Sequence, residues 1–441
     1  MERVHSNAIE LRQTRSLRPS PGNARSHPRK QIKQLAQSIE RFGFTSPVLI
    51  DDEDQILAGH GRVEAAKLLG LKTVPTLKIS HLNETERRAY MLADNKLALN
   101  ADWDQATLAL ELQGLMDLDF DVSLTGFSLA ELDFALDSAR EADPKRPSAG
   151  ADQLPLMSTD AVSRKGDLWI LGRHRLLCGD SRDPACFERL LGEDRADLIF
   201  TDPPYNIRID RYATGKGQYR HREFAMATGE MSPAAFTEFL TQTLANHARY
   251  ARDGAIAYVA MDWRHMGELL AAGRAAFNEL KNLCVWNKSN AGMGSFYRSK
   301  HELVFVFKVG TGPHINNFGL GADGRHRANV WDYAGVSGGG AARDEALAMH
   351  PTVKPVALVA DAIRDCSRRG DIILDGFGGS GATLIAAELC GRSARLIEID
   401  PLYVDTIVGR FEEFTGTPAT LAKTGATFEA VEDDRQWDDI A

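Results

Sequence analysis

The chain has 441 residues, of which 43% are hydrophobic and 26% charged, and its formal net charge is −9 at neutral pH. A chain of this length is too long to fold around one ordinary hydrophobic core, so two or three domains are expected. No apolar run is long enough to span a bilayer, and we therefore expect no membrane association. The 5 cysteines are widely scattered, without a disulfide framework or paired zinc-ligand spacing. The sequence therefore predicts no metal site and a reducing, cytoplasmic location.

Basic residues gather in two segments despite the acidic average. Residues 1–30 contain 7 Lys or Arg against 2 acidic residues, and residues 207–222 contain 5 against Asp210 alone. DNA is bound by local basic patches rather than by average charge, so the net charge does not exclude a nucleic-acid partner.

Residues 1–140 are predicted to form a small α+β domain. Apolar spacing predicts a helix over Gln31–Gly43, short strands over Pro47–Ile50 and Gln55–Ala58, and a helix over Val63–Leu69. Three more helices are expected over Thr85–Asn95, Asp104–Met116 and Leu129–Ala139. Residues 141–160 hold 3 prolines without apolar periodicity, and we interpret this segment as an interdomain linker.

Residues 161–441 are predicted to form an α/β domain with a doubly wound sheet, because helices separate most of its strands. The strands are expected at Asp167–Leu171, Arg175–Cys178, Asp197–Thr201, Ala255–Met261, Leu283–Trp286, Leu303–Phe307, Ile372–Leu374 and Arg395–Ile399. No helix separates Leu283–Trp286 from Leu303–Phe307, which predicts an antiparallel hairpin at one edge of the sheet.

The residues Asp202, Pro203, Pro204 and Tyr205 directly follow the apolar strand Asp197–Thr201. Ligands bind at the carboxyl ends of strands in an open α/β sheet, and the prolines fix the backbone there. Asp202 and the Pro203 carbonyl could each accept one N–H of an exocyclic amine, which exposes the nitrogen lone pair. Tyr205 would stack on the base once it has rotated out of the duplex. The alternative is a strand-ending turn capped by Asp202.

A second cluster joins a strand, a glycine-rich turn and a helix. Ile372–Leu374 is followed by Asp375-Gly376-Phe377-Gly378-Gly379-Ser380-Gly381 and by a helix over Ala382–Leu389. The glycines allow close backbone approach, and the helix N-terminus offers N–H groups to a carboxylate. Glu398 ends the next strand at the spacing expected of a group that binds ribose hydroxyls. This order of elements predicts an adenosine-containing cofactor.

Together the two clusters resemble the permuted (beta-type) DNA amino-methyltransferases of the adenine-N6/cytosine-N4 family, in which the target-amine motif precedes the cofactor loop. The resemblance covers residues 161–415 and implies a Rossmann-like fold, S-adenosyl-L-methionine as cofactor and double-stranded DNA as substrate. The segment His350-Pro351-Thr352-Val353-Lys354-Pro355 matches the family segment before the cofactor strand.

The resemblance also implies roles for single cofactor-pocket residues. Asp375 would accept from the methionine ammonium, Phe377 would lie near the methylthio group, and Lys354 would approach the methionine carboxylate. Asp180 would lie near the cofactor adenine. The pocket would also include Gly378, Gly379, Ser380, Gly381, Glu398 and His350. For His350 a capping or core position is the alternative, and for Asp180 a strand-end cap.

Target recognition is expected from residues 310–349, where Arg325 and Arg327 stand among aromatic residues that could stack or wedge. An ordinary loop is the alternative. The DNA backbone is expected to contact the basic residues Arg208, Arg211, Lys216 and Arg220.

The turn Gly59-His60-Gly61-Arg62 stands between a strand and a helix and resembles the ParB and sulfiredoxin superfamily. In that superfamily this turn can hold nucleotide phosphates, and Arg62 would be the phosphate contact. Gly61 stands where CTP-hydrolysing ParB proteins tend to carry a basic residue, and the sequence shows no separate helix-turn-helix. Nucleotide binding and a structural or DNA-docking role both stay open.

The sequence thus predicts a site-specific DNA methyltransferase that acts on the exocyclic amine of a flipped base. The aspartate that opens the target-amine motif favours adenine N6, with cytosine N4 as the alternative. A nucleotide-switched ParB-like DNA-binding protein is a rival that the intact cofactor loop disfavours. A methyltransferase of RNA or of protein glutamine is a second rival, disfavoured by the edge hairpin and the His-Pro-Thr segment. A homodimer and a cognate restriction enzyme are both compatible with the sequence.

Overall fold

The computed structural model describes residues 8–118, 120–128, 131–133, 135–136, 150–155, 160–207, 227, 229–289, 296–318, 327–334 and 353–438. The chain divides into two compact units, Met1–Ala142 and Asp143–Ala441. Each unit has buried apolar clusters of its own. Among the described residues, no helix is long and apolar enough to cross a membrane.

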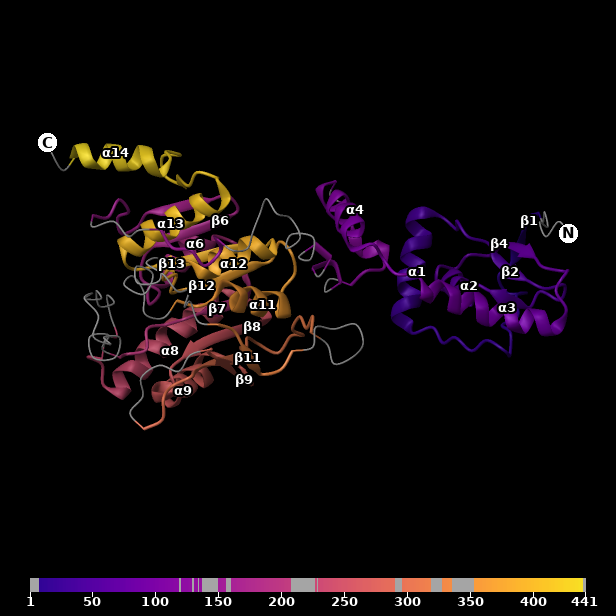
Figure 1. The fold of residues 1–441 in the computed structure, drawn as a ribbon, viewed down its shortest axis with the longest axis horizontal. Coiled ribbons are helices and arrows are strands. Elements are labelled where there is room, and N and C mark those ends of the chain that lie inside the picture. Colours follow the sequence, from indigo (N-terminus) through magenta and orange to yellow (C-terminus); the bar gives the residue numbers. More distant parts are fainter. Residues whose placement is uncertain are drawn as a thin grey trace. The chain divides into compact units, whose positions relative to one another are not determined.

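The described part of the first unit contains a four-stranded sheet in the order β1-β4-β2-β3 (Figure 1). The strands are β1 (Ile9–Gln13), β2 (Val48–Ile50), β3 (Ile56–Ala58) and β4 (Thr73–Lys78). Both predicted strands, β2 and β3, are confirmed. The sequence does not predict β1, which is largely exposed, or β4, which contains Pro75.

The helices of the first unit are α1 (Arg29–Phe42), α2 (His60–Leu68), α3 (Glu84–Leu97) and α4 (Gln105–Asp117). All four predicted positions are confirmed, and α1 ends at Gly43 as expected. α2 begins at His60 rather than at Val63. The cause is Gly59, whose left-handed φ of 101° turns the chain directly from β3 into the helix.

A smaller helical core follows in the same unit. Ala109 and Leu112 of α4 pack with Leu132 and Leu136. Residues 131–133 and 135–136 are helical, in agreement with the helix predicted over Leu129–Ala139. The helix begins with a capping box, since Glu131 N donates to Ser128 Oγ and Ser128 N donates to Glu131 Oε2.

Over its described residues, the second unit forms a ten-stranded sheet in the order β11-β9-β10-β8-β7-β12-β13-β6-β5-β14. The central strands β8, β7, β12, β13 and β6 are parallel, which confirms the predicted doubly wound α/β sheet. The strands are β5 (Leu168–Leu171), β6 (His174–Cys178), β7 (Ala196–Thr201), β8 (Ala251–Met261), β9 (Glu279–Asn287), β10 (His301–Lys308), β11 (Val330–Asp332), β12 (Ile372–Asp375), β13 (Ser393–Glu398) and β14 (Thr420–Leu421).

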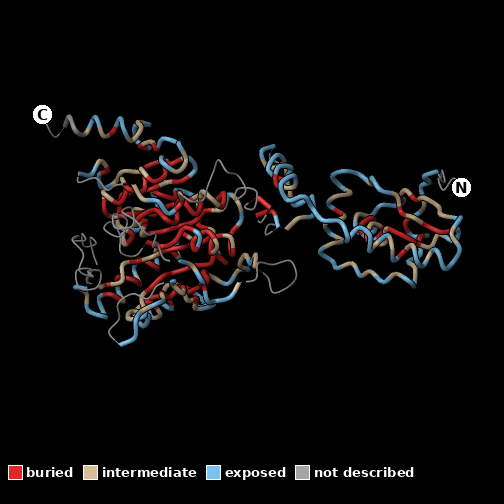
Figure 2. The backbone as a smooth tube through the Cα atoms, viewed as in Figure 1, coloured by how far each residue is buried: buried red, intermediate tan, exposed pale blue. Residues whose placement is uncertain are grey.

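Helices cover both faces of this sheet (Figure 1). One face packs against α6 (Pro184–Leu191), α8 (Pro233–Arg249) and α9 (Met266–Ala276). The other face packs against α11 (Val356–Cys366), α12 (Ala382–Cys390) and α13 (Pro401–Thr415). The buried residues concentrate in the strands between them (Figure 2). Because both faces are covered, the central strands are apolar without alternation.

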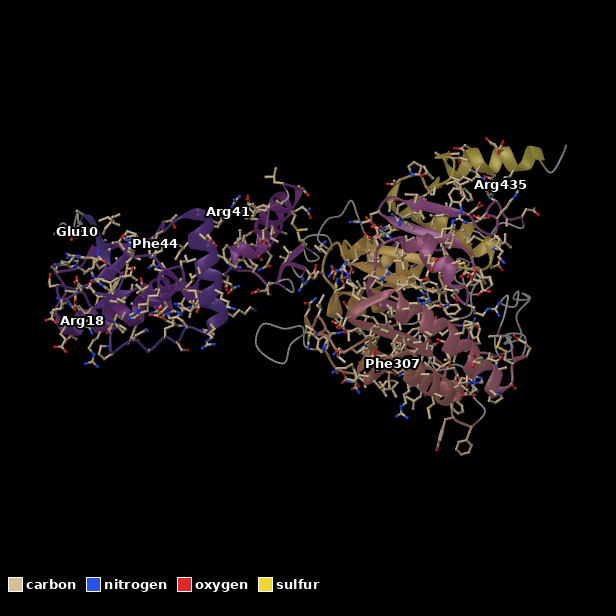
Figure 3. The ribbon with its side chains drawn as sticks, turned by 180° about the vertical axis from the view of Figure 1, so that it is seen from behind. Glu10, Arg18, Arg41, Phe44, Phe307 and Arg435 are labelled. Atoms are coloured by element: carbon tan, nitrogen blue, oxygen red, sulfur yellow. The ribbon has the colours of Figure 1, made fainter. Side chains whose placement is uncertain are left out.

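The predicted edge hairpin is confirmed: β10 pairs antiparallel with both β8 and β9. Phe307 of β10 lies in the interior (Figure 3), where a Cβ at Gly273 of α9 would overlap its ring. The sequence does not predict the three-residue strand β11, which pairs with β9 and buries Trp331. At the opposite side of the unit, Arg435 of α14 (Phe428–Asp438; Figure 3) pairs with Asp167 at 2.6 Å.

Part of the segment interpreted as a linker makes contacts within the second unit. Ala151 is buried, and its carbonyl accepts from Arg410 Nη2 at 2.6 Å. Asp152 Oδ1 accepts from Val356 N at 2.9 Å, at the start of α11. We therefore propose that the interdomain linker ends before Gly150 and that Ala151 and Asp152 belong to the second domain.

A pair of fragments tests this boundary. A fragment of residues 143–441 should be more stable than one of residues 160–441 by about 2 kcal/mol, because the shorter one lacks two hydrogen bonds worth about 1 kcal/mol each. Urea unfolding measures the difference. Equal stability of the two fragments would show that residues 150–153 do not belong to the folded domain.

Candidate functional site

The two predicted clusters meet where the order of the sheet reverses. β7 and β12 are parallel neighbours, but β7 continues through α8 to β8 on one side, whereas β12 continues through α12 to β13 on the other. Ligands bind at such a switch point, at the carboxyl ends of the strands. Asp202 follows β7 and Asp375 ends β12, and the Thr201 hydroxyl donates to Asp375 Oδ1 at 2.9 Å. The structure thus brings the target-amine motif and the glycine turn together.

The side chains beyond β7 form a network of charges. Lys354 Nζ lies 2.6 Å from Asp202 Oδ2 and 2.9 Å from Glu302 Oε2. The Tyr205 hydroxyl accepts from Lys354 Nζ at 2.9 Å and lies 2.7 Å from Asp202 Oδ1 and 3.1 Å from Glu302 Oε2. Lys288 Nζ donates to the other oxygen of Glu302. Two ammonium groups and two carboxylates therefore balance one another, and we name these four side chains with Tyr205 the lysine–carboxylate network.

The acid–base properties of the network differ from group to group. Burial alone would raise the pKa of Glu302, but Lys354 and Lys288 lower it to about 2. Burial raises the pKa of Asp202 even though Lys354 opposes the rise. Burial also disfavours the charged form of Lys354, but Asp202 and Glu302 outweigh it and raise the pKa of that ammonium. Glu302 is therefore the more firmly ionised of the two carboxylates.

Asn206 holds the next part of the chain against the target-amine motif. Its backbone has a left-handed φ of 53°. Its side-chain oxygen accepts from Gly229 N and Met231 N at 3.0 and 3.2 Å, and its amide donates to Met231 O at 2.9 Å. This residue fixes where the chain re-enters the site before α8.

The glycine turn after β12 is tightly built. Asp375 is buried, and its oxygens accept from the hydroxyls of Thr201 and Thr383 and from Phe377 N. Burial raises the pKa of Asp375 to about 7 although these bonds oppose the rise. Gly381 has a left-handed φ of 83°, which a residue with a side chain rarely adopts.

Glu398 ends β13 beside this turn, as predicted. Its two oxygens accept from Gly379 N at 2.7 Å and from Asp400 N at 2.9 Å. Burial raises the pKa of Glu398 to about 7 against the effect of these bonds. A carboxylate oxygen can accept more than one hydrogen bond, so both oxygens keep acceptor capacity for a ligand.

Further predicted cofactor residues surround the turn. A Cβ at Gly378 would lie 3.0 Å from Ile407, so the turn packs closely on α13. The Ser380 carbonyl accepts from Arg410 at 2.7 Å. The Phe377 ring packs on α8, with its centroid 6.0 Å from that of Phe239. These contacts fix the backbone of the turn.

Two predicted cofactor residues have other partners in the structure. Lys354, expected at the methionine carboxylate, lies in the lysine–carboxylate network instead. Asp180 forms a turn after β6: its Oδ1 accepts from Arg182 N at 2.9 Å and its Oδ2 pairs with Arg182 Nη2 at 2.6 Å. This geometry agrees with the strand-end cap, which was the alternative for Asp180. His350 lies outside the described residues.

Of the predicted DNA contacts, Arg327 lies within the described residues. Outside the described residues lie Arg208, Arg211, Lys216, Arg220 and Arg325. Arg327 is engaged within the protein, and DNA binding by this residue stays a prediction. Its guanidinium pairs with Asp365 at 3.0 Å and with Asp361 at 3.4 Å, and it stacks on Trp331. Trp331 is itself buried. Composition alone does not distinguish a buried ion pair and its aromatic neighbour from an exposed binding loop.

The predicted nucleotide turn of the first unit is also engaged within the protein. Arg62 Nη1 donates to Ser46 O at 3.0 Å, and His60 Nε2 accepts from Ser20 N at 3.2 Å. A Cβ at Gly61 would lie 3.0 Å from Leu35, so α1 packs closely on α2 at this residue. Nucleotide binding by Gly59–Arg62 stays a prediction.

Sequence reasoning missed Glu302, Lys288 and Asn206. Asn206 directly follows Tyr205, so its position in the motif could have identified it. Glu302 and Lys288 lie on the edge hairpin, and only the register that pairs Glu302 with Trp286 places them at the site. In the described part of the chain, no group of three or more His, Cys, Asp or Glu side chains could hold a metal ion.

Known proteins match the second unit. Residues 196–409 match a family model described as DNA methylase. Type II methyltransferase M.HpaI of Haemophilus parainfluenzae is 25% identical over 261 residues, which are 55% of this chain and 76% of that protein. Type II methyltransferase M2.MboI of Moraxella bovis is 23% identical over 242 residues, 51% of this chain and 83% of that protein. The solved PvuII DNA methyltransferase (cytosine-N4-specific) is 16% identical, with a TM-score of 0.41, over 63% of this chain and 94% of its own.

The first unit matches a different family. Residues 1–96 match the ParB N-terminal domain. The ParB-like nuclease domain-containing protein YnaK of Escherichia coli (strain K12) is 44% identical over 80 residues, 18% of this chain and 92% of that protein. Residues 106–165 match the ParB-methyltransferase HTH domain, so the expectation that no separate helix-turn-helix exists is wrong. Residues 196–409 therefore form a methylase domain of the N6/N4 family, and ParB N-terminal and ParB-methyltransferase HTH domains precede it in the chain.

Proposed function

We propose that this DNA methyltransferase transfers a methyl group from S-adenosylmethionine to N6 of adenine in double-stranded DNA. One observation carries the proposal: the Asp202 turn and the glycine turn lie at the ends of neighbouring parallel strands, joined by the Thr201–Asp375 hydrogen bond. An amine acceptor and a nucleotide-type cofactor turn are thereby adjacent, as methyl transfer between their ligands requires.

The residues of the glycine turn fit the cofactor that this family uses, S-adenosylmethionine. The Gly378–Gly381 backbone would approach the nucleoside closely, and the N-terminus of α12 would face its polar groups. Glu398 has acceptor capacity for two ribose hydroxyls. When bound, the sulfonium of this cofactor supplies an electrophilic methyl group, and the chain's own residues bind and orient the two partners.

Asp202 and the rigid prolines after it would act on the target amine. The lone pair of an exocyclic amine is conjugated with the base, so the nitrogen is a weak nucleophile. An Asp202 oxygen and the Pro203 carbonyl would each accept one N–H and hold the nitrogen with its lone pair exposed. Tyr205 would stack on the extruded base. The aspartate at position 202 favours adenine; cytosine N4 is the second candidate, and nucleoside analysis of the methylated DNA distinguishes them.

The edge hairpin offers a DNA contact near this site. Phe296 and Tyr297, between β9 and β10, are 88% and 82% exposed, and their rings contact each other edge to face. The basic residues Arg298 and Lys300 follow them in the sequence. Exposed aromatic rings can stack on or wedge between bases, and adjacent positive charge attracts phosphates. Both features support DNA as the substrate.

The role of Asp202 predicts a selective loss. Asp202→Ala should reduce methyl transfer to DNA by roughly 100–1000-fold, the effect typical of losing one preorganised group at a reacting centre. Cofactor affinity, measured by calorimetry, should be unchanged because Glu398 and the glycine turn are intact. Glu193→Ala, at an exposed glutamate before the other end of β7, is the control and should keep full activity. Normal transfer by Asp202→Ala would refute the role of this carboxylate.

The role of Glu398 predicts weaker cofactor binding. Glu398→Gln removes the negative charge that would strengthen the hydrogen bonds to the ribose hydroxyls. The dissociation constant for S-adenosylmethionine should therefore rise roughly 10–100-fold. Glu413→Gln, an exposed change on α13, is the control and should leave it unchanged. Equal affinity of both variants and the wild type would remove Glu398 from the pocket.

The same carboxyl group predicts a pH effect on stability. Since the folded-state pKa of Glu398 is raised from 4.5 to about 7, the stability it contributes is complete below pH 4.5 and is lost as the pH rises through 7. The loss amounts to roughly 3–4 kcal/mol, at about 1.4 kcal/mol per pKa unit. Between pH 5 and 8 the ligand-free wild type should therefore lose more stability to urea than Glu398→Gln does. Parallel curves would show that Glu398 does not titrate in this range.

A further inference from the structure

The lysine–carboxylate network presents a conflict that the proposed function alone does not resolve. Asp202 must accept an N–H of the target amine, yet one of its oxygens is in direct contact with an ammonium group. Lys354 Nζ lies 2.6 Å from Oδ2, and the Tyr205 hydroxyl lies 2.7 Å from Oδ1. An ammonium in direct contact withdraws negative charge from the carboxylate and makes it a weaker acceptor for a neutral amine. Lys354 must therefore loosen its contact when the base arrives.

Glu302 lies where it can hold Lys354 during that exchange. Its Oε2 is 2.9 Å from Lys354 Nζ, only slightly farther than Asp202 is, and its side chain is buried with 6% exposed. Glu302 pairs with Trp286 of β9, and from Leu303 onward the same strand is also bonded to β8, so the backbone that carries the carboxylate has a fixed position. A buried ammonium that leaves one carboxylate needs another at once, because an unpaired buried charge is strongly unfavourable.

The surrounding contacts keep Glu302 ionised and in place. Lys288 donates to its second oxygen and stacks on Trp286, with Nζ 4.6 Å from the ring centroid. The Tyr205 hydroxyl lies between the two carboxylates, 2.7 Å from Asp202 and 3.1 Å from Glu302. Tyr205 can thus donate to Glu302 when Asp202 turns to the amine, and its ring stays oriented.

We propose that Glu302 is a positioning residue: it retains Lys354 and the Tyr205 hydroxyl when the target base enters, and so frees Asp202 to accept the amine N–H. The inference rests on the proposed function. No covalent bond changes in this step; hydrogen bonds are exchanged between two carboxylates. Without the charge of Glu302, Lys354 has only Asp202 as a buried counter-ion and holds it away from the base.

Glu302→Gln tests the proposal, since it keeps the size and one acceptor oxygen but removes the charge. Single-turnover transfer of labelled methyl from saturating S-adenosylmethionine to DNA should slow roughly 10–100-fold, as for other groups that orient a reacting ligand. Cofactor affinity should stay near that of the wild type. Thermal stability should fall, because Lys354 and Lys288 lose a buried counter-ion, so the rate is measured at a temperature at which both proteins are fully folded. Glu302→Asp keeps the charge and should transfer faster than Glu302→Gln. Glu279→Gln, at the far end of the same hairpin and paired with Lys281, is the matched control and should leave the rate unchanged.

Each outcome decides the matter. Wild-type rates for Glu302→Gln, or equal losses for the Gln and Asp variants, would overturn the proposal. So would a fall in rate that is fully explained by weaker cofactor binding or by a smaller folded fraction at the assay temperature, because that pattern belongs to a merely structural residue. If the wild type itself transferred no methyl group to DNA, the proposed function would fail instead, so the two failures are distinguishable.

Discussion

The hydrogen bond between the Thr201 hydroxyl and Asp375 is the contact on which the rest of the site depends. Both side chains are buried, and each stands at the end of one of two neighbouring parallel strands. The order of the sheet reverses between these strands, so the loops beyond them diverge and leave room for ligands on either side. Because one loop carries Asp202 and the other the glycine turn, this one pairing of strands makes the proposed amine acceptor and the proposed cofactor turn neighbours. The folding of a sheet with helices on both faces thereby builds the site.

Buried charge is the second constraint. The lysine–carboxylate network contains as many ammonium groups as carboxylates, and Arg327 and Arg364 are likewise matched by Asp361 and Asp365. A buried charge is tolerated only with a partner. Such pairs make the site sensitive to the loss of one member, yet they also allow exchange: a lysine with two carboxylates can leave one while it keeps the other. Glu398 and Asp375 differ from the network because they are buried and, among the described residues, no cation pairs with them; burial therefore raises their pKa values.

The sequence predicted the elements that are determined by residues close together in the chain. The Asp202 turn, the glycine turn with Glu398, the edge hairpin and the doubly wound sheet all follow from strand patterns and from residues that end them. The strands β1, β4, β11 and β14 were missed, because they are exposed, interrupted by proline or only two or three residues long. Glu302 was missed since its place depends on strand register between distant segments. The two helices that contain Leu112 and Leu132 were each predicted within the ParB-methyltransferase HTH match. The apolar periodicity of a single helix does not show that the two pack against each other.

A structure of the chain with duplex DNA and a non-reactive analogue of S-adenosylmethionine tests the central claim most directly. The account predicts that the analogue lies on the glycine turn with its ribose at Glu398 and that an adenine has left the duplex. The N6 atom should be hydrogen-bonded to Asp202 and lie about 3–3.5 Å from the position of the transferable group, a separation from which transfer can proceed. Lys354 should then be held by Glu302. An analogue bound away from the glycine turn, or an extruded base whose amine does not face Asp202, would contradict the account.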